Sequence, residues 1–236
     1  MPTDLHEVIA DVSEVGGYFH LFTGHGDASW LPLSELFTDK AVLGERLART
    51  TDLLEIDEPR VAASLVQMGF ASRLWSPFVG AAVLHGRLLE WTVDDLRWQA
   101  VATGPLPLRL PSPKVRPDAD DPAAVIHRDV TALLESLAVA LQSLVKISTR
   151  LLWDNAASAL AGTTGVLALE RPEHAADAIT LALGILSRPP FEAAHRLTEP
   201  APGRPSFTRA ACCLYYRVPG SGKCGDCALR PRPARP

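Results

Sequence analysis

The sequence predicts a predominantly α-helical α+β fold, with a helical body, a small antiparallel sheet and an irregular C-terminal loop. Three observations predict this fold. Apolar residues recur at helical spacing along most of the chain, short apolar runs separated by turn residues gather between residues 87 and 110, and the four cysteines crowd near the C-terminus. With 236 residues, 47% of them hydrophobic, the chain is long enough to bury a substantial core.

The first part of the chain is expected to form short helices joined by loops. Residues 4–17 carry apolar side chains at helical spacing and end in Gly16-Gly17, which predicts a first helix. Mixed Gly, Pro and aromatic residues predict a loop and a short helix over residues 18–37. The next four leucines predict a helix interrupted near Asp52: Leu43, Leu47, Leu53 and Leu54.

A strong apolar helix is expected to begin at Pro59, because proline suits the first turn of a helix. Ser76-Pro77 is expected to break it, since an internal proline removes one hydrogen bond and clashes with the preceding turn. A second apolar helix then runs to about Leu84, before His85-Gly86.

Residues 87–110 change character and predict three short strands, at 88–92, 96–101 and 106–110. The proline inside the last of these runs indicates an edge strand. Residues 111–121 are rich in Pro and Asp, which predicts an exposed linker.

The longest helical pattern extends from about Pro122 to Ala161. Forty residues are unusually many for one helix, so a break is expected between Lys146 and Thr149. Pro172 opens another helix, which ends at about Leu186.

Charge divides the chain into two parts. From Arg204 to the end, seven basic residues accompany a single acidic one, Asp226, so this segment carries +6. Because the whole chain carries −4, residues 1–203 carry −10. We therefore expect a mostly helical body over 1–203 and a basic C-terminal segment over 204–236 that attracts anionic partners. Its last residues, RPRPARP, are expected to be disordered, and no nucleic-acid-binding motif accompanies them.

The compartment is predicted from what the sequence does not contain. No apolar run is long enough to span a membrane, and the first residues lack the basic and apolar regions of a secretory signal. These observations predict a cytoplasmic protein, in which cysteines stay reduced and more often bind metal than form disulfides.

The cysteines are spaced C-C-x10-C-x2-C: Cys212, Cys213, Cys224 and Cys227. Four thiolates suit either a tetrahedral zinc ion or a [2Fe–2S] cluster. Neighbouring side chains diverge, so the adjacent pair favours a cluster with two irons slightly over a single ion. The simplest pairing puts the Cys-x2-Cys sulfurs on one iron and the adjacent pair on the other, although spacing does not decide it.

Residues 209–229, RAACCLYYRVPGSGKCGDCAL, closely resemble the C-terminal motif of the FhuF-type ferric-siderophore reductases. Residues 148–160, STRLLWDNAASAL, resemble the mid-chain helix of the same family. The resemblance implies that the four cysteines bind a [2Fe–2S] cluster, which reduces the iron of cytoplasmic ferric siderophores. The rest of the chain resembles the family mainly in length and general character.

Five further residues are candidates for contact with the substrate or an electron donor. Arg209, Arg217 and Lys223 flank the cysteines, where positive charge favours a reduced cluster and attracts acidic donors or anionic substrates. Trp153 and Asn155 lie in the second family-like stretch. We expect them to form a pocket wall or to contact the cysteine loop. The tyrosines that follow the adjacent cysteines are expected to pack this loop against the body.

The seven histidines show no metal-binding spacing, and no glycine-rich nucleotide motif is present. If the protein is a reductase, its electrons must therefore come from another protein, such as a ferredoxin or a flavin reductase, or from a loosely bound donor. The sequence thus predicts an oxidoreductase that releases iron from a ferric siderophore, of hydroxamate or similar type, by one-electron reduction. The alternative is a non-catalytic module that binds a siderophore or a partner protein and carries a structural zinc site formed by the four cysteines.

Overall fold

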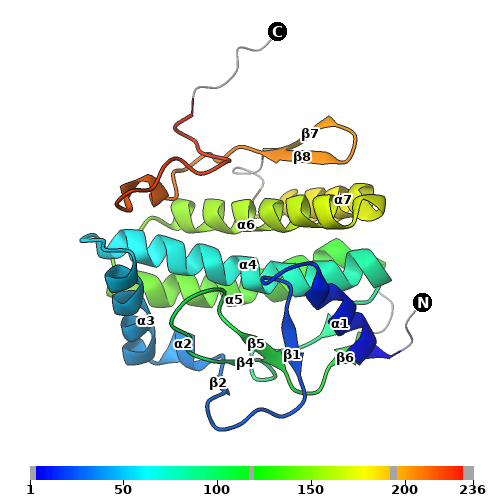
Figure 1. Cartoon of the computed structure of the whole chain (residues 1–236), viewed down its shortest axis with the longest axis horizontal. Helices are drawn as coiled ribbons and strands as arrows, with labels where there is room; N and C mark the ends of the chain where they lie inside the picture. The colour runs from blue at the N-terminus through cyan, green and yellow to red at the C-terminus, as the bar shows by residue number, and fades with distance from the viewer. Residues whose placement is uncertain (1–3, 117–119, 192–195, 231–236) are drawn as a thin grey trace.

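The computed structural model describes residues 4–116, 120–191 and 196–230, and its helices stack in layers above a small sheet (Figure 1). Two long helices pack along each other at the centre: α4 (Pro59–His85) and α6 (Thr149–Glu170). Two others pack against this pair: α5 (Pro122–Leu144) and α7 (Ala175–Leu186). The predicted fold class is confirmed, since 54% of the described residues are helical and the sheets are small.

Helix α4 is continuous, so the break expected at Ser76-Pro77 is wrong. Pro59 occupies its first turn, and Gly86 ends it with a left-handed φ of 62°. An internal proline costs a helix about 3 kcal/mol. Burial outweighs that cost here, because each large apolar side chain removed from water contributes about 1.5–3 kcal/mol and most of this half of α4 is buried.

The helices before α4 lie close to their predicted positions. The predicted first helix is confirmed as α1 (Leu5–Glu14). The next helices are α2 (Glu35–Thr38) and α3 (Lys40–Leu53). The interruption expected near Asp52 corresponds to the end of α3, which stops at Leu53, one residue later, so that Leu54 lies outside the helix.

The break expected within the long pattern after Pro122 is confirmed, because α5 ends at Leu144 and α6 begins at Thr149. The expected end of α6 at about Ala161 is wrong, since the helix continues to Glu170. Its central threonine hydroxyls are satisfied inside the interface, Thr163 by Ser76 on α4 at 2.9 Å. The next helix begins at Pro172 as a short 3₁₀ turn, η1 (Pro172–His174), and α7 ends at Leu186 as predicted.

The main sheet has the strand order β1-β5-β4-β2. Its strands are β1 (Leu21–Thr23), β2 (Leu31–Pro32), β4 (Arg97–Trp98) and β5 (Leu108–Leu110). β5 pairs on both sides, in parallel with β1 and antiparallel with β4, so its prediction as an edge strand is wrong. The proline at 107 precedes the strand and leaves every amide of β5 free to pair.

Two further pairs of strands complete the structure. β3 (Leu89–Glu90) pairs with β6 (Lys114–Val115), which lies inside the predicted linker 111–121, of which residues 117–119 fall outside the described part. β7 (Leu197–Ala201) pairs with β8 (Arg204–Phe207) above α6 (Figure 1). The sequence analysis missed this hairpin, because its prolines and mostly exposed residues give no alternating pattern. The tail expected to be disordered lies largely beyond the described residues, from 231 onward.

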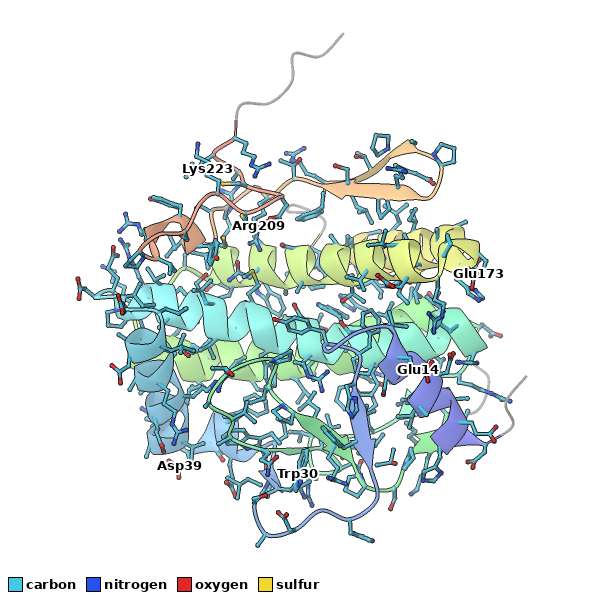
Figure 2. All side chains as sticks on the ribbon, in the orientation of Figure 1. Glu14, Trp30, Asp39, Glu173, Arg209 and Lys223 are labelled. Atoms are coloured by element: carbon cyan, nitrogen blue, oxygen red, sulfur yellow. The ribbon has the colours of Figure 1, made fainter. Side chains whose placement is uncertain are left out.

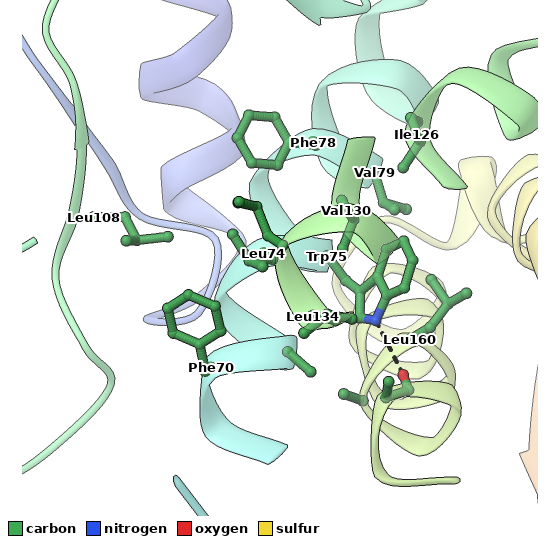
Figure 3. Close-up of a cluster of buried hydrophobic side chains, with 14 of the residues drawn as sticks. Phe70, Leu74, Trp75, Phe78, Val79, Leu108, Ile126, Val130, Leu134 and Leu160 are labelled. Carbon is green, nitrogen blue, oxygen red and sulfur yellow. Dashed lines mark hydrogen bonds between the residues drawn. The ribbon is translucent and has the colours of Figure 1, made fainter. Parts of the chain in front are cut away.

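The core centres on Trp75, which is 0% exposed and reaches from α4 to the Ala156 carbonyl of α6 at 3.0 Å (Figure 3). Leucine and valine side chains of α5 and α6 surround its ring, including Leu134 and Leu160. This contact fixes α6 on α4, and α6 in turn carries the residues beneath the cysteines. Among the described residues, no helix is both long and apolar enough to cross a membrane.

Candidate functional site

The four cysteines lie in an irregular stretch, residues 208–230, which we call the cysteine segment. It runs over α6 toward the start of α4 and contains one short 3₁₀ turn, η2 (Tyr215–Arg217) (Figure 1). Figure 2 shows Arg209 and Lys223 of this segment above α6. Cysteine ligands on an irregular backbone can approach a metal group from directions that a helix or strand does not allow.

The structure brings together cysteines from the two ends of the segment. The Sγ atoms of Cys213 and Cys224 lie 3.6 Å apart. Cys213 and Cys227 are buried, whereas Cys212 and Cys224 are partly exposed. This sulfur contact joins the two arms of the segment. Which sulfurs share an iron stays a prediction from the spacing.

The local backbone points amide groups at two of the sulfurs. The Leu214 amide donates to the Cys212 sulfur, and the Leu229 amide donates to the Cys227 sulfur, each at 3.4 Å. Leu214 has a left-handed φ of 68°, which turns the chain back directly after the adjacent cysteines. Amide hydrogen bonds of this kind stabilise thiolates and tune the potential of an iron–sulfur cluster.

The geometry of one sulfur pair fits a metal held by thiolates. Two sulfurs on one tetrahedral metal, with bonds of about 2.3 Å, lie about 3.8 Å apart. The Cys213–Cys224 separation of 3.6 Å is close to that value. Within the described residues, no three His, Cys, Asp or Glu side chains converge on one ion position.

Burial and neighbouring cysteines raise the pKa of the two partly exposed thiols, Cys212 and Cys224. For both, desolvation is the largest cause, and the adjoining sulfurs add to it. In the metal-free chain these thiols are therefore protonated at neutral pH. Binding a metal group releases those protons, as at other thiolate sites.

Arg209 joins the two arms of the cysteine segment and is only 1% exposed. Its backbone amide donates to the Asp226 carbonyl and its Nε donates to the Asp226 carboxylate, both at 2.9 Å. Asp226 stands between the Cys-x2-Cys ligands, so this ion pair ties the start of the segment to its last loop. Charge-assisted pairs of this kind are strong when the remaining donors are also satisfied.

The rest of the Arg209 guanidinium binds the helices below. It donates to the Asn155 amide oxygen and to the Ser158 hydroxyl, each at 2.6 Å, both on α6. It also contacts the Met68 sulfur of α4 at 3.0 Å. Arg209 therefore docks the segment on the body and is too deeply buried to meet a substrate or a donor protein directly.

Three further side chains fasten the first cysteine arm. Asp154 of α6 is buried and accepts hydrogen bonds from the Ala210 and Ala211 amides, at 3.3 and 2.6 Å. Burial raises the pKa of this carboxyl, against the opposing effect of the two amides. Ser64 of α4 donates to the Cys213 carbonyl at 2.7 Å, and Asn155 donates to the Ser64 hydroxyl at 2.9 Å.

The exposed side of the segment is cationic and aromatic. Arg217, Lys223 and Arg230 are exposed, and Arg217 forms an ion pair with Glu58 at the start of α4. Tyr215 and Tyr216 are 39% and 42% exposed, and the turn η2 that carries them contacts α4. Their expected packing of the loop against the body stays a prediction. The buried Val218 adds an apolar contact beneath the segment.

Trp153 packs against the hydrophobic core. Its ring lies edge-on against the ring of Phe191, with 5.7 Å between the two ring centroids. Asn155, two residues later, belongs to the Arg209 network instead. The two candidates of this stretch thus face different sides of α6.

Ser64, Met68 and Ser158 support the cysteine segment, and the sequence analysis did not find them. Each is a small or flexible residue in an apolar helical pattern, and nothing in such a pattern marks which one faces a distant loop. Asp226 carried a signal, because it is the only acidic residue of a basic segment. A lone acid among cations at a ligand turn indicates a specific partner, here Arg209.

Comparison with known families matches one part of the chain. The model of the FhuF 2Fe-2S C-terminal domain matches residues 209–229, which confirms the resemblance over the cysteine motif. The cofactor of this segment is accordingly a [2Fe–2S] cluster. None of the curated proteins compared matches the chain.

Proposed function

We propose that the protein is a cytoplasmic ferric-siderophore reductase whose cluster is held by Cys212, Cys213, Cys224 and Cys227. The match to the FhuF 2Fe-2S C-terminal domain supports it. The observation that carries the redox role is the uneven exposure of the cysteines, with one pair buried and the other reaching the surface. Electron transfer from a donor protein needs such an exposed edge, whereas a metal that only stabilises a fold does not.

The substrate is an oxygen chelate of Fe(III), such as a ferric hydroxamate. Hard anionic oxygen ligands hold Fe(III) more tightly than Fe(II), so reduction loosens the metal. When bound, the cluster supplies single electrons by outer-sphere transfer. The Fe(III) gains one electron and becomes Fe(II), which competing ligands then remove, and a reduced donor protein replaces the electron.

In this scheme the residues of the chain hold the cluster and orient its ligands, and none has to move a proton. Arg209 and Asp226 keep the two cysteine arms together, and Asp154 fixes the first arm on α6. The amides that point at the sulfurs stabilise the thiolate form. A one-electron step between metal centres requires no general acid or base.

The electron donor is proposed to be an acidic redox protein, of the ferredoxin or flavin reductase type, docking on the exposed cations of the segment. Arg209 and Asp226 neutralise each other internally. The outer surface of the segment is therefore left with Lys223 and Arg230, together with Arg217, which also pairs with Glu58, around the partly exposed cysteines. Complementary charge accelerates such encounters and makes them sensitive to salt.

Anaerobic purification with metal and sulfide analysis tests the proposed function. We expect about two irons and two sulfides per chain, with visible absorption that dithionite bleaches and a ferric siderophore restores. About one zinc per chain without sulfide would contradict the redox function and would favour a module with a structural zinc site held by the four thiolates. A loaded cluster that ferric chelates do not reoxidise would also contradict it.

The donor surface gives a second prediction. Reversing two charges together, Arg217→Glu with Lys223→Glu, should slow reduction by an acidic ferredoxin on the order of tenfold at low salt. Reduction by dithionite should stay unchanged, because that reagent needs no docking surface. Lys40→Glu with Arg128→Glu reverses one exposed lysine on α3 and one exposed arginine on α5, and is the matched control. An equal rate for the variant at Arg217 and Lys223 and for the control would argue against docking at this surface.

A further inference from the structure

A cavity of about 410 Å³ lies between α4 and α6 and is closed at one side by the loop of residues 16–19. We call it the α4–α6 cavity, and its volume is within the range of small-molecule sites. Four of its wall positions are glycines, among them Gly69 on α4 and Gly162 on α6. A Cβ built on either of these two would meet no atom within 4 Å, so both glycines face open space.

The cavity adjoins the network that holds the cysteines. Met68 and Ser158 line it, and both contact the guanidinium of Arg209, at 3.0 and 2.6 Å. The Ser158 hydroxyl also donates to the Asp226 carboxylate, between the Cys-x2-Cys ligands, at 2.5 Å. A second hollow shares Ser158 and Gly162 and reaches Gly225 and Asp226. One layer of side chains thus separates the α4–α6 cavity from the cysteine loop.

The walls carry no charged side chain. They consist of apolar groups, glycines and the hydroxyls of residues such as Ser72 and Thr163. A strongly charged ligand entering such a site would lose its hydration without gaining a counter-charge, which is costly. An electroneutral ligand with an apolar periphery has no such cost. The walls therefore match a metal chelate whose ligand charges balance those of the ion.

We propose that the α4–α6 cavity is the binding site for an electroneutral Fe(III) chelate, in which three singly charged bidentate groups surround the ion. This proposal rests on the proposed function and adds the place and the charge selectivity of substrate binding. The chelate sits beside Ser158, and its Fe(III) accepts one electron from the cluster side and becomes Fe(II). The electron comes from the reduced donor protein.

Filling the cavity from its open glycines tests the site. Gly162→Leu and Gly69→Leu each place a side chain in the cavity without a backbone clash, and leucine suits both helices. Gly165→Leu is the matched control, since Gly165 also faces open space on α6 but does not line the cavity. Equal cluster content and thermal unfolding of all three variants and the parent chain show that the fold is kept.

The first measurement uses gallium(III) tris-hydroxamate, a neutral chelate that cannot be reduced, and records binding by calorimetry. We expect binding to the parent chain and to Gly165→Leu, and a loss of at least about tenfold in affinity for the two cavity variants. A trianionic gallium tris-catecholate should bind more weakly than the neutral chelate. Equal affinity of all variants, no binding to the parent chain, or preference for the trianionic chelate would overturn the proposal.

The second measurement separates this site from the proposed function. The dithionite-reduced protein is mixed with ferric tris-hydroxamate, and the return of the visible bands is followed. Reoxidation should slow in the cavity variants with the chelate but not with ferricyanide, which needs no cavity. If the gallium chelate binds as expected and the ferric chelate restores no absorption, the reductase function fails and the binding site stands.

Discussion

Arg209→Gln should deprive the protein of its cluster under conditions in which the parent chain keeps it. The substitution leaves the carboxylate of Asp226 without its cation. It also removes the guanidinium N–H groups that donate to Asn155 and Ser158. Removing one partner of a buried, hydrogen-bonded ion pair costs about 3–5 kcal/mol. Since about 1.4 kcal/mol is a factor of ten, the undocked population of the cysteine segment should rise at least about a hundredfold.

Hydrogen exchange on the metal-free protein and iron and sulfide content after anaerobic purification measure this effect. Amides of the cysteine segment should lose protection in Arg209→Gln, while the amides of α4 and α6 keep theirs. Arg209→Lys should be intermediate, because lysine keeps the charge but not the planar fork. Arg204→Gln changes an exposed arginine on β8 and is the control. Wild-type cluster content in Arg209→Gln would show that the ion pair does not position the ligands.

The Arg209 network also shows which features of the site can be predicted from the sequence and which cannot. The cysteines, their likeness to a known motif and the importance of the stretch around Asn155 all follow from residue types and local spacing. The partners of Arg209 do not, because Met68, Asn155 and Asp226 lie on three separate elements. Contacts of that kind depend on how α4 and α6 pack, and a single sequence carries no signal for helix packing across such distances.

The fold has the same division between local and distant effects. The break between α5 and α6 and the ends of α7 were predicted, because prolines, caps and apolar periodicity act within a few residues. The continuation of α4 through Pro77 was not, since the cost of the proline is local but the burial that outweighs it comes from other helices. The interior position of β5 likewise depends on β1, far away in the chain.

Trp75→Ala should produce the largest loss of global stability. The side chain is fully buried, its indole donates to the Ala156 carbonyl, and its ring packs edge-on against Phe191 at 6.1 Å. Truncating a buried tryptophan to alanine costs about 3–5 kcal/mol, through lost apolar burial and the cavity left behind. A domain of this size is typically stable by about 5–15 kcal/mol, so this one change removes a large part of the total.

The tryptophan also links stability to the site, because it fixes on α4 the helix that carries Asp154, Asn155 and Ser158. Urea unfolding of the metal-free protein should show a lower midpoint for Trp75→Ala. Trp75→Phe should lose less, about 1–3 kcal/mol, since a phenyl ring keeps most of the packing but not the hydrogen bond. Cluster retention should fall in the same order as stability. If the alanine variant unfolded like the parent chain, Trp75 would not be what holds α6 on α4.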